Sequence, residues 1–147
     1  MTDDDSAFDV EQQQRNVAAV RAGIEGWASG TNSPFVLLAD DATWEITGNS
    51  DAAGTYSGRA ELMSRVIVPL AARMSTPLIP AIRALFCDGD TVIALFDAES
   101  TATDGQPYRN TYAWFMQFRG DCIVKVTAFY DSVAFNDLWR RVTPVLD

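Results

Sequence analysis

The sequence contains no histidine. This absence excludes the usual Ser-His-Asp and Cys-His nucleophilic machinery, histidine-ligated metal centres and imidazole proton shuttles. Only two cysteines are present, Cys87 and Cys122, and they are too few and too poorly spaced for a metal knuckle. We therefore predict no metal and no cofactor. Any acid-base chemistry must come from Asp, Glu, Tyr, Cys, Lys or water.

Basic residues are also scarce. Eleven Lys and Arg against twenty Asp and Glu give a formal charge of -9, so the surface repels phosphate backbones and anionic lipid headgroups. No apolar run approaches the roughly 18 residues that a spanning helix requires, and residues 1–9 are acidic, unlike a secretory signal. The sequence therefore predicts a cytoplasmic protein with no nucleic-acid or membrane partner.

The length and composition are those of one globular domain. The chain has 147 residues, of which 48% are hydrophobic and 21% charged, far from the composition of disordered segments. We predict a single domain over residues 1–147, in which residues 1–11 form a flexible acidic tail.

The first half of the chain carries helical patterns. Apolar residues recur at three- and four-residue intervals over residues 12–29, which predicts an amphipathic helix. Ser33 and Pro34 are typical of the cap and first turn of a short helix over residues 34–38. A third helix is predicted over residues 59–74, with a kink or an early end at Pro69, which has no backbone N–H to donate.

The second half carries strand patterns. After an expected first strand over residues 42–47, segments rich in β-branched and aromatic residues (78–87, 91–103, 108–118 and 122–130) are separated by Asp-Gly and Gly-Asp turn signals. A closing helix is predicted after Asp131, which suits the cap position. This order predicts an α+β fold. Because the central strands are apolar on both faces and the helices can cover only one, we predict a homodimer.

Several segments in this order resemble the SnoaL-like branch of the nuclear-transport-factor-two-like superfamily. They are "LADDATWEITG", "GTYSGRAEL", "DGDTVIALFDAEST", "DGQPYRNTYAWFMQF" and "VKVTAFYDSVAF". The resemblance implies a cone-like curved antiparallel sheet, wrapped by three N-terminal helices and a short C-terminal helix around an apolar pocket. Its members include isomerases, polyketide cyclases, dehydratases, epoxide hydrolases and proteins that only bind ligands or dimerise, and a fold alone does not choose among these.

The catalytic residues of two relatives do not carry over. By ungapped register, the base of ketosteroid isomerase falls near Ile46, its oxyanion tyrosine near Gly23 and its protonated acid near Trp114. For limonene epoxide hydrolase, the arginine position is Leu95 and the second aspartate falls near Ala128. Neither constellation can be assembled from these residue types.

Asp97 and Arg83 are the remaining candidates for chemistry. If Asp97 faces the pocket, desolvation would raise its pKa and make it a usable acid or base; the alternative is a solvent-facing carboxylate. A three-residue turn pairing Cys87 with Thr91 would place Arg83 and Asp97 on one face, and a two-residue turn would place them on opposite faces. Their ion pair would be either functional or merely structural.

We expect polar and aromatic side chains to complete a small-molecule site. Tyr56 is expected to act with Asp97 and Arg83, and the substrate-binding candidates are Trp27, Trp44, Asn110, Tyr112 and Trp114. Large aromatic side chains commonly pack in cores, which is the alternative for this group. The Gly-rich loop over residues 48–58 is the candidate for a gate at the mouth of the pocket.

The leading hypothesis is a cofactor-independent acid-base enzyme of the isomerase, cyclase, lyase or epoxide hydrolase type. Its substrate would be a small hydrophobic oxygenated molecule such as a polyketide, terpenoid or steroid-like compound. The alternatives are a non-catalytic domain that binds a small hydrophobic ligand and a dimerisation domain whose cavity is filled by its own side chains.

Overall fold

The computed structural model describes residues 3–145, and the side chains of residues 10–145. Its elements, in chain order, are α1 (Asp3–Ser29), the 3-10 turn η1 (Pro34–Leu37), β1 (Leu38–Ile46), β2 (Gly54–Ser57), α2 (Arg59–Leu62), the π turn η2 (Met63–Ile67), α3 (Val68–Ala71), β3 (Ile79–Asp88), β4 (Thr91–Thr101), β5 (Pro107–Arg119), β6 (Cys122–Tyr130) and α4 (Ser132–Arg141). The predicted α+β class is confirmed, and a short strand β2 is added to the predicted set.

One curved sheet contains all six strands, in the order β2-β1-β6-β5-β4-β3. Neighbouring strands are antiparallel except β1 and β6, which pair in parallel with Trp44 opposite Val126. The predicted antiparallel sheet is therefore correct for the meander and wrong for this one pair. The chain between β1 and β6 passes through a helical segment and four strands before returning, and that long crossover allows a parallel pairing.

Helix α1 is longer than the sequence predicts. It begins at Asp3 instead of residue 12, so residues 3–11, expected as a tail, belong to the helix, and residues 1 and 2 lie outside the described part. At its other end the helix meets the following turn closely, because a Cβ at Gly26 would lie 2.2 Å from the Cβ of Asn32. Only glycine fits at position 26, and its close contact with Asn32 sets the path of the turn between α1 and η1.

The helical segment over residues 59–71 changes geometry in its middle. Four residues of α2 are followed by the π turn Met63–Ile67 and then by α3, which holds Pro69 in its first turn. The prediction of a disturbance near Pro69 is confirmed, and the wider π geometry lies just before the proline. Proline removes one donor from the helical ladder, and π turns commonly accommodate such interruptions.

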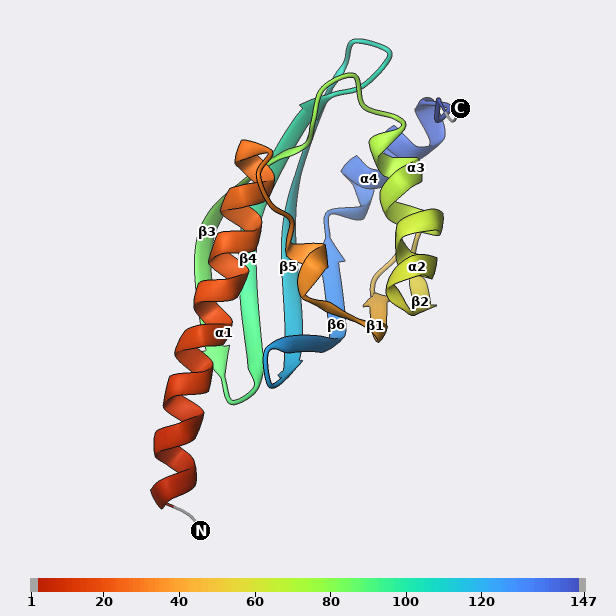
Figure 1. The fold of residues 1–147 in the computed structure, drawn as a ribbon. Helices are drawn as coiled ribbons and strands as arrows, with labels where there is room; N and C mark the ends of the chain where they lie inside the picture. The colour runs from red at the N-terminus through yellow and green to blue at the C-terminus, as the bar shows by residue number, and fades with distance from the viewer. Residues whose placement is uncertain (1–2, 146–147) are drawn as a thin grey trace.

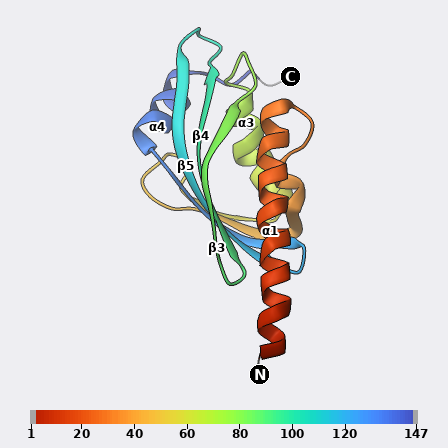
Figure 2. The ribbon, with the colours of Figure 1, turned by 90° about the vertical axis from the view of Figure 1, so that its left-hand side faces the viewer.

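The helices cover one face of the sheet. Figure 1 shows α1 in front of β3 and β4, and the segment α2–α3 on the right beside β1 and β2, with the sheet curving between them. Figure 2 shows α1 running alongside the curved sheet, which bends away behind it. The covered face carries alternate residues of the strands, among them Val92, Ala94, Phe96, Trp114, Met116 and Val126, all buried. The core therefore lies in the concave side of the sheet.

No helix in the described part of the chain is both long enough and apolar enough to span a bilayer. Within the same residues, no cluster of three or more Cys, Asp or Glu side chains could hold a metal ion. The cytoplasmic location stays a prediction from the sequence.

Candidate functional site

A cavity of about 570 Å³ lies between the concave face of the sheet and the helices that cover it. Its size is in the range of small-molecule sites. Its walls come from all parts of the fold: Trp27, Ser33, Phe35, Trp44, Ile46, Met63, Val66, Ile67, Leu70, Ala71, Met74, Ser75, Thr76, Pro77, Leu78, Tyr112, Trp114, Ala128, Tyr130 and Phe135. The cavity that the sequence predicts is therefore present and apolar.

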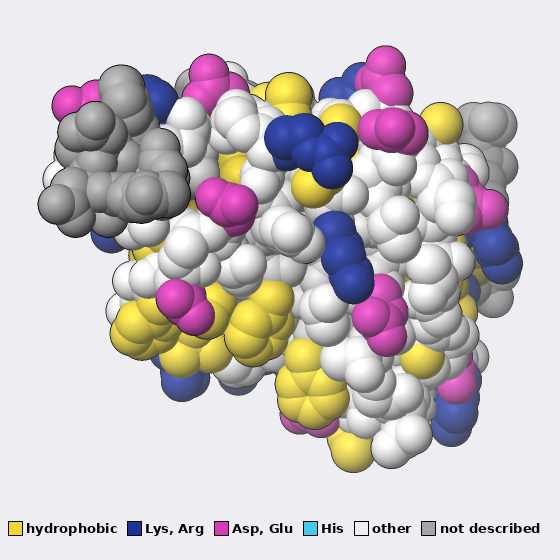
Figure 3. All heavy atoms as spheres, turned by 90° about the horizontal axis from the view of Figure 1, so that it is seen from below, with side chains coloured by type: hydrophobic (Ala, Val, Ile, Leu, Met, Phe, Trp, Pro, Cys, Tyr) yellow, Lys and Arg dark blue, Asp and Glu magenta, His cyan; other side chains and the backbone are white. Residues whose placement is uncertain are grey.

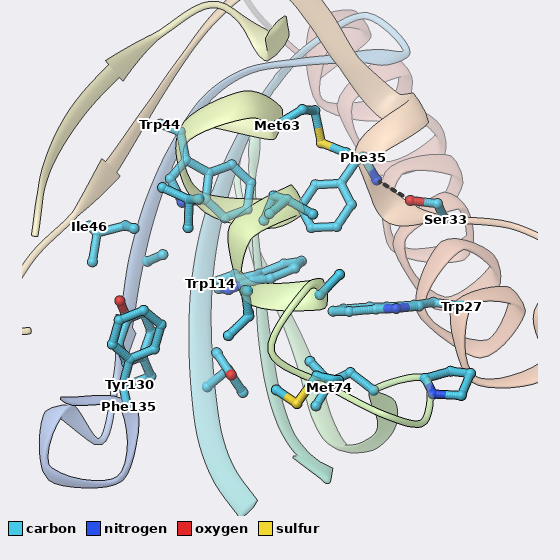
Figure 4. Close-up of a pocket in the computed structure, with 18 of the residues that line it drawn as sticks. Trp27, Ser33, Phe35, Trp44, Ile46, Met63, Met74, Trp114, Tyr130 and Phe135 are labelled. Atoms are coloured by element: carbon cyan, nitrogen blue, oxygen red, sulfur yellow. Dashed lines mark hydrogen bonds between the residues drawn. The ribbon is translucent and has the colours of Figure 1, made fainter. Parts of the chain in front are cut away.

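Three tryptophans form one side of this cavity. Figure 4 shows Trp114 near the centre, with Trp44 on one side and Trp27 on the other. The ring of Trp114 is nearly parallel to that of Trp27, with centroids 6.0 Å apart, and meets Trp44 edge to face at 5.0 Å. Phe35 contacts all three rings. Because the rings hold one another in place, the wall presents a rigid aromatic surface.

The placement of Phe35 follows from local capping. The Ser33 hydroxyl accepts a hydrogen bond from the Phe35 N–H at 3.1 Å, as Figure 4 shows, and Pro34 occupies the first turn of η1. The predicted cap is confirmed. It turns the chain so that Phe35 packs on the tryptophans.

The polar groups of the wall are hydroxyls and indole N–H groups. Tyr112 and Tyr130 contribute phenols, and the Tyr130 hydroxyl is paired with that of Ser50 at 2.9 Å. Burial raises the pKa of Tyr130 and raises that of Tyr112 well above its ordinary value. Both phenols therefore stay protonated near neutral pH, as hydrogen-bonding groups instead of bases.

Exposed residues form the rim of the cavity after α3. Ser75, Thr76 and Pro77 are exposed and also line the cavity, so the cavity reaches the surface there. The loop over residues 48–58 contributes no lining residue, so the expectation that it gates the pocket is wrong. It lies instead beside the start of α4, where the Asp51 N–H donates to Asn136.

Asp97 does not face this cavity. Its neighbours Phe96 and Ala98 point into the core, so Asp97 lies on the opposite, outer face of β4, with 44% of its side chain exposed. Hydrogen bonds from Arg83 and from Thr111 lower the pKa of Asp97, the reverse of what pocket burial was expected to do. The premise that Asp97 is a desolvated pocket carboxylate is therefore wrong.

Arg83 and Asp97 do form an ion pair, by a route that the sequence analysis did not include. The turn is of the two-residue kind, with Asp88 opposite Thr91, which alone would separate the two side chains. A register shift between Ile82 and Ala84 makes Arg83 an extra, bulged residue. The bulge brings Arg83 Nε within 2.8 Å of Asp97 Oδ2 on the outer face.

Tyr56 and Asn110 also lie away from the cavity wall. The Tyr56 hydroxyl donates to the carbonyl of Ala52 at 2.6 Å, and the Arg65 guanidinium lies over its ring. Asn110 is buried and bonds to the backbone of Asp131. Of the predicted site residues, the structure thus gathers Trp27, Trp44, Tyr112 and Trp114 at the cavity, and leaves Asp97, Arg83, Tyr56 and Asn110 outside it.

Three positions at which the compared enzymes carry acidic groups lie in the cavity wall. Ile46 and Trp114 stand near the base and the acid of ketosteroid isomerase, and Ala128 stands near the second aspartate of limonene epoxide hydrolase; all three line the cavity. Each is apolar and buried. Within residues 10–145, the side chains lining this cavity include no Asp, Glu, Lys, Arg or Cys.

Sequence reasoning missed several wall residues. Phe35, Met63, Met74, Tyr130 and Phe135 line the cavity, and nothing in the strand or helix periodicity separates a wall residue from a core residue. The caps at Ser33 and Asp131, two residues before Phe35 and four before Phe135, were the available local signals for these two aromatic residues.

Comparisons with known proteins agree with this architecture. The chain superposes on Bal32a from a soil-derived mobile gene cassette with a TM-score of 0.74 at 18% identity, covering 88% of this chain and 99% of that one. It superposes on TerC crystallised with polyporic acid with a TM-score of 0.68 at 20% identity, covering 86% of this chain and 98% of TerC. For a candidate SnoaL-like polyketide cyclase from Jannaschia sp. CCS1 the TM-score is 0.69 at 11% identity, and the match covers 86% of this chain and 92% of the cyclase.

At such identities these likenesses concern the fold alone. The comparison with curated proteins gives no match. The model of the SnoaL-like domain, however, matches residues 20–126, most of the chain, including the first tryptophan of the cavity wall and the strands that hold the others. The chain therefore belongs to the SnoaL-like domain family.

Proposed function

We propose that this chain binds a small, largely apolar, oxygen-bearing molecule in the aromatic cavity, without acid-base catalysis by a charged side chain. The observation that carries the proposal is the make-up of the wall, where aromatic and aliphatic side chains occupy even the positions near Ile46, Trp114 and Ala128. General acid-base catalysis needs a titratable group within hydrogen-bonding reach of the substrate. The wall offers an apolar ligand a large contact area and a few neutral hydrogen-bonding groups.

Ligand size and polarity follow from the same wall. Flat apolar surface is favoured against the stacked rings of Trp27 and Trp114, because burying it removes apolar area from water. A ligand with a full charge is disfavoured, because an unpaired buried ion loses its hydration. TerC, which shares the fold, was crystallised with polyporic acid, which supports a small organic ligand as the occupant.

A second candidate function is an isomerase or cyclase that works through phenols. It is favoured by the hydroxyls of Tyr112 and Tyr130, which lie in the wall and stay protonated. One preorganised donor at a developing oxyanion contributes about 3 kcal/mol. Catalysis would then consist of holding the substrate in a bent conformation and polarising its carbonyl group. Tyr130→Phe would lower kcat without changing KM.

Intrinsic fluorescence tests the binding proposal directly, since three of the four tryptophans line the cavity. Titration with tetralin or with 1-tetralone should quench or shift the emission saturably. Ala128→Met, which fills buried space in the wall, should weaken binding at least tenfold. Ala81→Met makes the same change on the exposed outer side of β3 and should leave binding unchanged.

Two results would count against the proposal. If neither probe binds the folded wild-type chain, the cavity is not a site for apolar ligands. If Ala128→Met binds as well as wild type, the probes occupy some other surface.

We also propose that the chain forms a homodimer through the outer face of the sheet. The face carries a patch that we call the outer patch, consisting of Ala84, Phe86, Ile93, Leu95, Ala113, Phe115 and Phe129, adjacent to one another by strand register. Phe86, Phe115 and Phe129 are 56, 42 and 52% exposed. Figure 3 shows hydrophobic side chains gathered along one side of the end where the β3–β4 and β5–β6 turns lie.

The charges around the outer patch favour a second copy of the chain as its partner. Paired side chains of both signs, Arg83 with Asp97 and Arg109 with Glu99, border it on one side, and Glu45 and Lys125 lie on the other. A two-fold contact brings the same surface onto itself, so a border of mixed sign avoids like-charge repulsion despite the net charge of -9. Sedimentation of the wild-type chain should give a dimer.

Leu95→Glu should then produce a folded monomer, because it places an unpaired charge in the contact. Val36→Glu, at an exposed residue of η1 far from the patch, is the matched control and should stay dimeric. A wild-type monomer at micromolar concentration rules this dimer out.

A further inference from the structure

A hydrogen-bond chain that starts at a side-chain amide of fixed orientation ends at the cavity wall. It begins at Asn110, a buried residue of β5 whose side-chain Oδ1 accepts the N–H groups of Thr111 at 2.7 Å and Asp131 at 3.0 Å. A backbone N–H can only donate, so the atom that faces both of them must be the amide oxygen. The Asn110 NH₂ group therefore points the other way and acts as a donor.

That NH₂ group donates to the hydroxyl of Tyr108 at 2.8 Å and to the carbonyl of Asp131 at 3.0 Å. The Tyr108 side chain is buried, and its oxygen lies 2.7 Å from the hydroxyl of Tyr112. Among the described residues, the one group that can accept the Tyr108 proton is the Tyr112 hydroxyl. Either phenol can be the donor in this bond, and whichever donates, the other keeps a proton that no further group among the described residues accepts. Only Tyr112 lines the cavity, so an acceptor on a ligand there can pair the remaining proton when Tyr108 donates to Tyr112.

In that arrangement Tyr112 accepts a hydrogen bond from Tyr108 and keeps its own proton for the ligand. Its ring is held by stacking on Phe96, with centroids 5.1 Å apart and an interplanar angle of 9°. Apart from the Tyr108 oxygen, no side chain or carbonyl in the described part of the chain accepts the Tyr112 proton, and the residue lines the cavity. A proton without a protein acceptor beside an apolar cavity is available to a ligand.

We propose that the Tyr112 hydroxyl is the hydrogen-bond donor that recognises an acceptor oxygen of the cavity ligand, an inference that rests on the proposed binding function. Because the phenol remains protonated and no cation lines the cavity within the described residues, the matching group is neutral: a ketone, lactone or ether oxygen instead of a carboxylate. Tyr112 is a specificity-determining residue, and Asn110 and Tyr108 position its hydroxyl through their hydrogen bonds.

The test compares 1-tetralone with tetralin, which share a carbon skeleton and differ by the carbonyl group. Tyr112→Phe keeps the ring and removes the donor. We expect it to weaken binding of 1-tetralone roughly tenfold while the affinity for tetralin changes by less than twofold. Tyr56→Phe is the matched control outside the cavity, because the Tyr56 hydroxyl already donates to the Ala52 carbonyl, and it should leave the ratio of the two affinities unchanged.

The carbonyl stretching frequency of bound 1-tetralone gives a second readout that packing does not imitate. In the wild-type chain it should lie below its value in a hydrocarbon solvent and should rise in Tyr112→Phe. If that variant does not fold, the wild-type frequency alone decides: a hydrocarbon-like value overturns the inference.

The outcomes separate this inference from the proposed function. If both probes bind and Tyr112→Phe weakens them equally or not at all, Tyr112 is not the donor, although the cavity is a binding site. If neither probe binds the wild-type chain, the binding proposal fails, and the assignment of Tyr112 fails with it.

Discussion

A carboxylate acts on a bound ligand only from the side of the strand that faces the ligand. Asp97 has the right chemistry and stands on the right strand, but β4 alternates, and its inward positions are taken by Ala94, Phe96 and Ala98. On the outer face, Asp97 is paired with Arg83 and bonded to Thr111. Its contribution is therefore to the surface of the sheet and to the border of the outer patch.

This position gives a prediction for Asp97→Asn. Since the side chains of Asp97 and Arg83 are 44 and 55% exposed, solvent screens their attraction, and the loss of stability should be about 0.5 kcal/mol or less. The pKa of Asp97 is lowered on folding, so this small stabilisation is present above its unfolded value of roughly 4 and is lost as the pH falls below it. Urea unfolding at neutral and acid pH measures both effects.

Binding of 1-tetralone should be unaffected by the same substitution. A tenfold loss of affinity in a variant of normal stability would return Asp97 to the functional site.

The role of a single residue was predictable from sequence where neighbouring residues alone determine it, as at a helix cap. Ser33 and Asp131 accept the expected capping hydrogen bonds, because a short polar side chain before a helix has few better partners. The side of β4 on which Asp97 lies was not predictable, because it depends on pairing register and on a bulge, and no local propensity reports a bulge at Arg83.

Among the elements, α3 and α4 are joined by a buried arginine that the sequence analysis did not single out. Arg73 follows α3 and donates to the carbonyls of Pro69, Trp139 and Val142, at 2.9 to 3.2 Å. Its guanidinium lies 3.8 Å from the centroid of the Trp139 ring. It thus satisfies carbonyls at the end of α4 that the helix leaves without partners, and it joins α4 to α3.

Replacing Arg73 with Met should destabilise the protein by about 2 kcal/mol, because carbonyls at a buried helix end lose their donor. Arg73→Lys should recover only part of this, since an ammonium group cannot reach three separate carbonyls in one plane. Thermal and chemical unfolding measure the effect. Arg21→Met, at an exposed site of α1, is the control and should change stability by less than 0.5 kcal/mol in the usual range for surface sites; an equal loss in both variants would contradict this account.

Helices and hairpins were largely predictable, and the added elements were not. Apolar periodicity and Asp-Gly turn signals located α1, the β3–β6 meander and α4. Strand β2 is four residues long in a Gly-rich segment, and its pairing with β1 is a tertiary contact. The parallel contact between β1 and β6 joins segments separated by most of the chain, beyond the reach of local pattern.

For the whole molecule, the four tyrosines behave as one group. Burial raises the pKa of each, Tyr56, Tyr108, Tyr112 and Tyr130, and the sequence contains no others. A raised pKa means that the folded state holds its protons more tightly than the unfolded state. Stability should therefore be independent of these groups below about pH 10 and should fall as the pH rises above it.

Ultraviolet titration of phenolate checks this prediction. No tyrosine of the native protein should ionise at the ordinary phenol pKa, and the phenolate signal should appear together with the loss of tertiary structure. A phenolate step near pH 10, the usual phenol value, in a chain that remains folded would show that at least one phenol is open to water.

The rim after α3 also determines how the fold could change its ligand. Residues 75–78 form one continuous stretch of chain, while the three tryptophans of the wall are set in the sheet and in α1. Insertions or substitutions in that stretch would resize the entrance without touching the strands. The same fold could in this way bind ligands of different length against one rigid aromatic wall.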